Sequence, residues 1–150
     1  MIEKILASIP TIMTKTTLTK PFYEAVLQRL VSFGYELKES DAWVLGFTMQ
    51  KVENHILNSC NIASIPDGLF HIAVDMVVGE FLLAKKTFSP DDLTGFNLDY
   101  AVKQIQMGDT STTFATGDAS MTPEQRLTTF IDYLLSYGKA ELVTFRRIRW

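Results

Sequence analysis

The stretch that decides the fold is residues 66–86, PDGLFHIAVDMVVGEFLLAKK. Only four residues between positions 69 and 84 are not apolar: His71, Asp75, Gly79 and Glu80. At 3.6 residues per turn, the first three fall on one line of a helix and the fourth lies beside its end. A helix that is apolar nearly all round needs neighbours on most sides, so this stretch predicts the central, buried helix of a helical domain.

A membrane span is the alternative interpretation of this stretch. Pro66 suits the first turn of a helix, and Lys85–Lys86 suit the negative end of its dipole. Two carboxylates and a histidine interrupt a run that is already shorter than the ~20 residues a span needs. We therefore predict a buried helix and no membrane partner.

Length and composition favour a single domain, residues 1–150. The net charge of −3 gives no general attraction to nucleic acid or to acidic membranes. Cys60 is the single cysteine, so an internal disulfide is excluded. Glu3 and Lys4 interrupt the apolar start of the chain, and no cleavage site follows it. We therefore expect an intracellular protein.

Three further helices are predicted before the central one. An apolar face over residues 2–9 closes at Pro10, within an N-terminal segment 1–15. A second helix starts near residues 19–21 and ends before Gly34, which suits a left-handed cap. A third helix covers Ala42–Cys60, with Asn61 as its cap. Its predicted solvent face consists of Lys51, Glu53, Asn54 and Asn58.

The chain after the central helix is predicted to be less regular. Residues 87–121 are expected to form a long loop or a β-hairpin with Gly108–Asp109 at its turn, although residues 98–115 also fit a helix. A capping box at Thr122–Gln125 starts a helix that Gly138 ends. Residues 140–150 are expected to extend as a C-terminal arm. The predicted fold is mainly α: a small orthogonal helical bundle around a central buried helix.

Few residues offer catalytic or metal chemistry. His55 and Cys60 fall on different faces of one predicted helix and lack the further ligands of a zinc site. The spacing of Gly108–Asp109 and Gly117–Asp118 matches neither a calcium loop nor a phosphate loop, and indicates turns. The sequence therefore predicts no enzyme, no cofactor and no metal.

Two groups of polar residues could instead mediate contacts. His71 and Asp75, with Glu80 near them, could hold a proton or a metal, but a polar seam crossed by another helix or a partner is favoured. The C-terminal residues could bind phosphates and a base, but in an acidic chain a protein-docking arm explains them better. The predicted docking residues of this arm are Phe145, Arg146, Arg147, Ile148, Arg149 and Trp150.

The order of these elements resembles the phage head–tail connector (adaptor) family of phages and prophages of Gram-positive bacteria. The resemblance covers the chain from about Thr16 onward and depends on the combined order of its strings. These strings are Gln50–Ile56, Cys60–Ile62, Ile65–Pro66, Asp75–Leu82, Gly108–Asp109, Thr122–Arg126 and Phe145–Trp150.

The resemblance implies a small, mainly helical structural protein of the virion without catalytic activity. In this family a homo-oligomeric ring of about a dozen copies lies below the portal and extends the DNA channel. The ring joins the portal protein to a stopper or tail-completion protein, and DNA passes without sequence-specific binding. The expected location is the head–tail interface, or the host cytoplasm before assembly.

Two other classes stay open on the sequence. Short helices joined by tight turns can imitate a helix-turn-helix, so a small DNA-binding or regulatory module of prophage origin is one alternative. Neither the second nor the third predicted helix has a basic recognition face, which counts against it. A small-molecule binder or enzyme that uses His71 and Asp75 is the other alternative.

Overall fold

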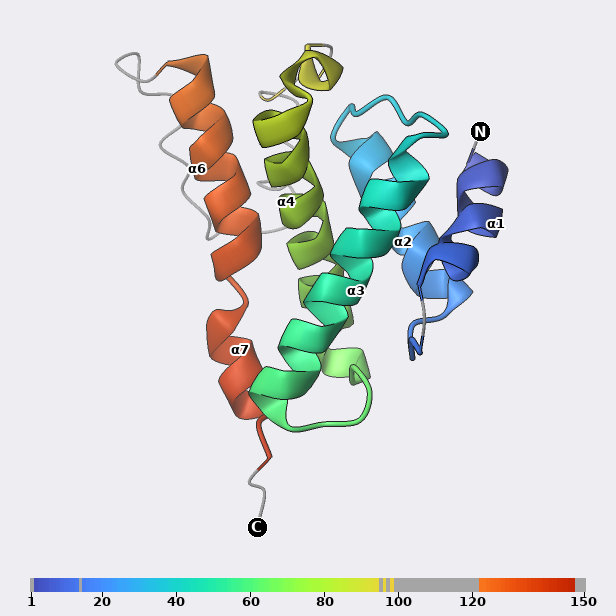
Figure 1. The fold of residues 1–150 in the computed structure, drawn as a ribbon. Helices are drawn as coiled ribbons and strands as arrows, with labels where there is room; N and C mark the ends of the chain where they lie inside the picture. The colour runs from blue at the N-terminus through green and yellow to red at the C-terminus, as the bar shows by residue number, and fades with distance from the viewer. Residues whose placement is uncertain (1, 14, 95, 97, 99–121, 148–150) are drawn as a thin grey trace.

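The computed structural model describes residues 2–13, 15–94, 96, 98 and 122–147, and these form a bundle of helices without a strand (Figure 1). The predicted mainly helical fold is confirmed. The helices are α1 (Ile2–Ile12), α2 (Lys20–Ser32), α3 (Asp41–Cys60), α4 (Phe70–Phe88), α6 (Pro123–Ser136) and α7 (Lys139–Thr144), with short 3₁₀ turns η1 (Asp67–Leu69) and η2 (Pro90–Leu93) at the two ends of α4.

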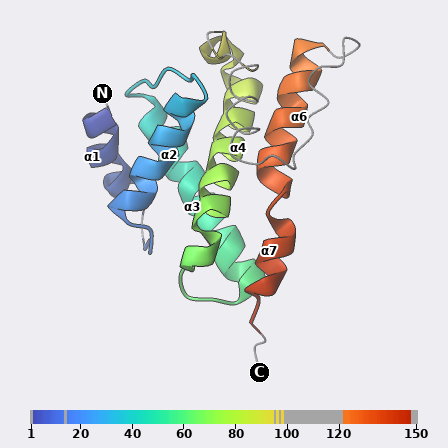
Figure 2. The same ribbon diagram turned by 180° about the vertical axis from the view of Figure 1, so that it is seen from behind.

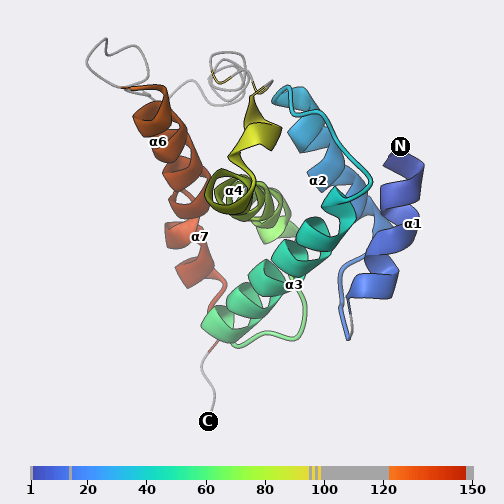
Figure 3. The ribbon, with the colours of Figure 1, turned by 45° about the horizontal axis from the view of Figure 1, so that its top comes forward.

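Helix α4 is the centre of the bundle, as its sequence predicts. It contacts α2, α3 and α6, and Figure 3 shows these helices arranged around it. Seen from behind, α2 and α6 lie on either side of α4 (Figure 2). Val77, Val78 and Phe81 are completely buried. A Cβ at Gly79 would lie 2.9 Å from Leu135 Cδ2, so this glycine permits the close approach of α6. No described helix is long and apolar enough to cross a membrane.

The N-terminal helix differs from its prediction, because α1 continues through Pro10 to Ile12. Proline lacks the N–H that would bond back one turn, so this position weakens the helix. Packing compensates: Ile5 and Ile9 are buried, and α1 lies against α3 and α2. A Cβ at Gly46 of α3 would lie 2.8 Å from Ile12 Cγ2. The first helix is therefore part of the core and is not left uncovered.

The predicted helix ends are largely confirmed. Gly34 has a φ of 87° just after α2, and Asn61 has a φ of 54° at the end of α3. Thr122 and Gln125 form the reciprocal bonds of a capping box at the start of α6. The entry to α4 differs, since Pro66 is extended and the turn η1 precedes the α-helix. The predicted loop also begins later, because α4 includes Thr87 and Phe88.

The prediction of an extended arm over residues 140–150 is wrong for residues 140–144, which are helical. Residues Lys139–Thr144 form helix α7, which packs against α3, and Leu142 is buried. Gly138 ends the previous helix but also starts this one, with a close approach to Ile72. The described chain then runs to Arg147. Residues 148–150 of the arm and residues 99–121 of the predicted loop lie outside the described residues.

Candidate interaction site

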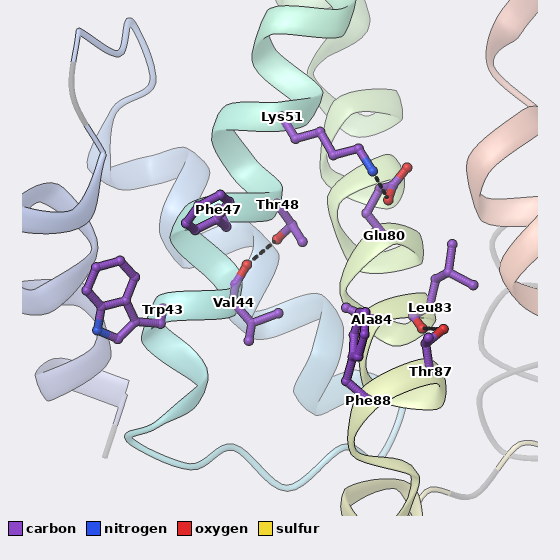
Figure 4. A pocket seen from close by; sticks show the side chains of 10 residues that line it. All are labelled: Trp43, Val44, Phe47, Thr48, Lys51, Glu80, Leu83, Ala84, Thr87 and Phe88. Carbon is purple, nitrogen blue, oxygen red and sulfur yellow. Dashed lines mark hydrogen bonds and ion pairs between the residues drawn. The ribbon is translucent and has the colours of Figure 1, made fainter.

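A groove lies between α3 and α4 on the surface of the described chain, and we name it the α3–α4 groove (Figure 4). It encloses about 420 Å³. Three aromatic side chains in it face solvent, with exposed fractions of 63% for Trp43, 69% for Phe47 and 83% for Phe88. Its lining residues are Trp43, Val44, Phe47, Thr48, Lys51, Glu80, Leu83, Ala84, Thr87 and Phe88.

Helix periodicity explains why these side chains lie outside the core. One face of α3 packs in the core through Leu45, Met49, Val52 and Ile56. Trp43 and Phe47 are four residues apart, so they form a second stripe on another face of the helix. In Figure 4, Val44 and Thr48 lie on the side of α3 that faces α4, and Trp43 projects from the other side of α3. Phe88 lies on α4. The groove is thus a by-product of an α3 that is apolar on two faces.

An ion pair closes one end of the groove. Lys51 Nζ of α3 lies 3.0 Å from Glu80 Oε2 of α4, as the dashed line in Figure 4 shows. The lysine is largely exposed and the pair is neutral overall. The rest of the lining is almost entirely apolar, apart from the hydroxyls of Thr48 and Thr87, which donate to backbone carbonyls of their own helices. Such a groove suits an apolar protein surface better than a charged ligand.

A buried ionic cluster joins the start of α3 to the end of α4. Lys85 Nζ lies 2.7 Å from Asp41 Oδ1 and 2.8 Å from Asp92 Oδ2, and Lys38 Nζ lies 2.7 Å from Asp92 Oδ1. Tyr35 Oη donates to Asp41 Oδ2 at 2.9 Å. Asp41 and Lys85 are almost inaccessible to solvent. This cluster, Tyr35–Lys38–Asp41–Lys85–Asp92, fixes α3, α4 and η2 to one another.

The pKa values in this cluster follow from its contacts. Burial alone would lower the pKa of Lys85, but its bonds to Asp41 and Asp92 outweigh burial and raise it. Hydrogen bonds from Lys38 and Lys85 lower the pKa of Asp92 to about 2. Burial, together with the bond to Asp41, raises the pKa of Tyr35. These pKa shifts favour the charged forms of Lys85 and Asp92, and therefore their ion pair.

The predicted polar seam of α4 is divided among three neighbours. Asp75 is buried, accepts from Arg29 Nε of α2 at 2.8 Å, and accepts from Tyr137 Oη at 2.7 Å. Burial and the charge of Asp75 raise the pKa of Tyr137. Glu80 instead faces α3, and His71 is exposed. Asp75 thus joins α4 to α2 and to Tyr137, while Glu80 contacts a different helix.

Glu53 is the clearest error in the predicted solvent face of α3. Its side chain is 2% exposed, and it accepts hydrogen bonds from Thr16 Oγ1 at 3.0 Å, Thr17 N at 2.8 Å and Thr17 Oγ1 at 2.6 Å. The segment between α1 and α2 therefore folds over α3 and is bound there through Thr16 and Thr17. Burial raises the pKa of Tyr23, and the negative charge of Glu53 raises it further.

The described part of the docking arm is tied to the end of α3. Arg147 N donates to Cys60 O at 2.7 Å, and Asn61 Nδ2 donates to Arg147 O at 3.0 Å. Phe145 is half-buried, and a Cβ at Gly68 would lie 2.4 Å from its ring. Phe145 is therefore a core contact, while Arg146 and Arg147 are exposed. Ile148, Arg149, Trp150, Gly108 and Asp109 lie outside the described residues.

Metal ligands do not gather in the described chain, where no group of three or more His, Cys, Asp or Glu side chains could hold an ion. Cys60 is buried and its thiol donates to Leu142 O, while His55 is exposed. Comparison with known proteins adds nothing, since no family model, no curated protein and no solved structure matches the chain. Functional inference therefore depends on the residues of the chain itself.

Sequence reasoning missed the α3–α4 groove. The stripe Leu45, Met49, Val52 and Ile56 accounts for one apolar face of α3, so Trp43 and Phe47 are apolar residues in excess of what the core needs. These two extra apolar residues could have indicated an exposed apolar surface on α3. Phe88 gave no such indication, because the helix was predicted to end at residue 86 and α4 continues to Phe88.

Proposed function

We propose that the protein is a structural, non-enzymatic assembly protein of the phage head–tail connector type. In this role a ring of subunits lies beneath the portal, extends the DNA channel, and joins the capsid to the stopper or tail. The observation that carries the proposal is the α3–α4 groove, in which Trp43, Phe47 and Phe88 face solvent on an otherwise well-packed body. Exposed aromatic clusters of this kind are typical of protein–protein contacts.

The positions of the connector-like strings support this role. Gln50–Ile56 lies on α3, Asp75–Leu82 lies on α4, and Thr122–Arg126 starts α6. Val52, Ile56, Val77 and Phe81 are buried within them. The resemblance therefore lies in residues that build the bundle and its helix ends, as expected for a family that shares a framework and not a reaction.

The charge of the chain is compatible with a DNA conduit. A subunit with a net charge of −3 has no general electrostatic attraction to DNA phosphates, so DNA can pass through the channel without binding to it. The exposed Arg146 and Arg147 provide cationic groups near the end of the chain. We propose that they and residues 148–150 contact the portal or a neighbouring subunit through carboxylates on its surface.

A joining assay tests the proposal. Purified protein is mixed with tail-less heads that carry a cognate portal, and attachment is followed by negative-stain microscopy and by infectivity after tails are added. We expect rings at the portal vertex and restored infectivity. Absence of binding to portal-bearing heads at any protein concentration would contradict the proposed function.

A matched pair of variants locates the contact. Arg146→Glu with Arg147→Glu reverses the exposed charges, whereas Lys139→Glu with Lys20→Glu reverses two exposed charges elsewhere. Only the arginine variant should lose head attachment. Equal loss in both variants would show that general charge, and not the arm, controls attachment.

A further inference from the structure

The chemistry of the α3–α4 groove describes the segment that would fit it. Phe47 and Phe88 are largely exposed, so two aromatic rings of the groove are in contact with water. Glu80 lies at one end of the groove with its carboxylate partly exposed beside Lys51. Aromatic rings pack against other apolar groups and attract cations, and a carboxylate accepts two parallel N–H bonds from an arginine. The groove therefore suits a segment in which an aromatic anchor adjoins an arginine.

The chain carries such a segment after α7. Residues 148–150 read Ile-Arg-Trp, follow the exposed Arg146 and Arg147, and lie outside the described residues. Tryptophan and arginine are among the side chains that most often anchor protein interfaces. Trp150 supplies the anchor and Arg149 the guanidinium group, so the composition of the segment matches the apolar lining and the single carboxylate of the groove.

Residues 148–150 cannot reach the aromatic end of the groove in their own subunit. Arg147 N is bonded to Cys60 O at the last residue of α3. Phe88 lies near the first residue of α3, because Lys85, one turn before it, pairs with Asp41. The 20 residues of α3 separate these places by about 30 Å, whereas three extended residues span about 10 Å. A segment 148–150 that fills this part of the groove therefore comes from a second copy of the chain.

We propose that residues 148–150 of one subunit dock in the α3–α4 groove of the next subunit. Trp150 enters between Phe47 and Phe88 of that neighbour, and Arg149 donates to the carboxylate of its Glu80. Because the contact joins two different surfaces of the subunit, it repeats head to tail and can close into a ring. The proposal deepens the proposed function by naming the docking site of the arm, and rests on it only for the closure of that ring.

The ion pair at the end of the groove leaves Glu80 open to exchange. The Lys51 side chain is largely exposed, so its ammonium can turn into water when an arginine approaches. A guanidinium group binds a carboxylate through two donors at once, whereas an ammonium is a point charge. Arg149 of a neighbour can thus replace Lys51 without leaving an unpaired charge in the contact.

Complementation between two full-length variants tests the docking. Trp150→Ala removes the anchor and keeps the groove, whereas Phe47→Asp alters the groove and keeps the anchor. In sedimentation velocity at up to about 1 mM protein, the wild type should form multimers and each variant alone should stay monomeric. An equimolar mixture of the two variants should form a dimer that grows no further, because only one arm and one groove are intact.

The expected loss in each variant alone is at least about 30-fold in the dissociation constant, as for removal of a central aromatic anchor. Val143→Asp is the matched control, because Val143 is also 69% exposed but lies on α7, and it should associate like the wild type. A mixture that stays monomeric, or a variant that forms multimers on its own as the wild type does, would overturn the proposal.

Two changes in the ion pair separate binding of the arm from the shape of the groove. Glu80→Gln removes the acceptor of Arg149 and should weaken association about fivefold. Lys51→Met breaks the same pair but frees the carboxylate, so association should be unchanged or stronger. Equal weakening in both variants would mean that the pair only maintains the groove, and would overturn the contact between Arg149 and Glu80.

Cross-linking places the arm on the neighbour. A cysteine appended after Trp150 in one copy should join Thr87→Cys of another copy through a short bis-maleimide, because Thr87 lines the groove. The same appended cysteine should not join Val143→Cys, and the natural Cys60 is buried. Equal cross-linking to positions 87 and 143 would overturn docking in the groove.

The outcomes distinguish this inference from the proposed function. A wild-type protein that stays monomeric up to about 1 mM would overturn the docked arm, and the connector role would stand if the protein still joined heads to tails. Multimers that need both Phe47 and Trp150 but attach to no portal-bearing head would do the reverse. Loss of head attachment in Trp150→Ala with unchanged self-association would assign the arm to the portal and overturn its docking on a neighbouring subunit.

Discussion

The ends of α3 and α4 that meet near η2 have two faces with opposite chemistry. On the inner face, Asp41 and Lys85 are buried as an ion pair; on the outer face, Trp43 and Phe88 are exposed to water. Folding alone favours the opposite arrangement, with aromatic groups inside and charges outside. The contrast indicates that the ion pairs hold the helices together while the aromatic residues stay available for another molecule. Four experiments test this contrast.

The largest effect is expected from Lys85→Met, which removes the buried cation. Asp41 would then be an unpaired carboxylate with no access to water, and such a change lowers the free energy of unfolding by about 3–5 kcal/mol. Urea denaturation followed by circular dichroism measures it. Lys38→Met is the control, because the Lys38 side chain is half exposed and its loss should matter much less. An equal loss of unfolding free energy in both variants would show that the buried Asp41–Lys85 pair does not hold the ends of α3 and α4 together.

A smaller effect is expected from Asp75→Asn at the middle of α4. The amide keeps the shape but loses the charge that Arg29 and Tyr137 contact, so stability should fall by about 1–3 kcal/mol. Tyr137→Phe removes one hydrogen bond and should cost about 1 kcal/mol. Thermal and urea unfolding of both variants test this order. An unchanged Asp75→Asn protein would mean that the seam is merely solvated.

Acid should weaken the cluster through Asp92. Its pKa is about 2 in the folded protein and is near 3.8 ordinarily, so its stabilising contribution is complete above about pH 4 and is lost as the pH falls through 2. Urea unfolding at several values between pH 5 and pH 2 should show stability decreasing with acid. Asp92→Asn should flatten part of that decrease. An unchanged slope in the variant would assign the acid sensitivity to other carboxylates.

The smallest effect on stability is expected on the outer face. Phe88→Ser should change the free energy of unfolding by no more than about 0.5 kcal/mol, because the side chain is 83% exposed. Phe81→Ala, seven residues earlier on the same helix, removes a completely buried ring and should cost about 3–5 kcal/mol. Urea titrations give both values. A large loss for Phe88→Ser would mean that the groove serves folding and not recognition.

Local signals in the sequence predicted much of this fold. Periodicity located α3 and α4, and the chemistry of Gly34, Asn61 and the Thr122–Gln125 box located helix ends, because caps and turns depend on neighbouring residues. Helix α1 was cut short at Pro10, since tertiary packing outweighed the local signal. Helix α7 was missed because a short helix has little periodicity of its own.

The candidate site was harder to predict than the fold. Glu53 looks like any solvent carboxylate until residues 16 and 17 fold against it, some 36 residues away along the chain. Asp41 is the first residue of α3, yet its partner Lys85 comes from the far end of another helix. Such pairings depend on which helix ends meet, and periodicity within one helix does not contain that information.

Arg147 is attached to the end of α3, at the opposite end of this helix from the groove. Figure 1 shows the start of α3, which bears the groove, at one end of the body and the outgoing chain at the other. The 20 residues of α3 hold these two places about 30 Å apart, at 1.5 Å per residue. The bonds of Cys60 and Asn61 to Arg147 hold Arg147 at the end of α3. The helix is therefore a rigid spacer that keeps the exposed aromatic residues near its start apart from the two exposed arginines beyond its end.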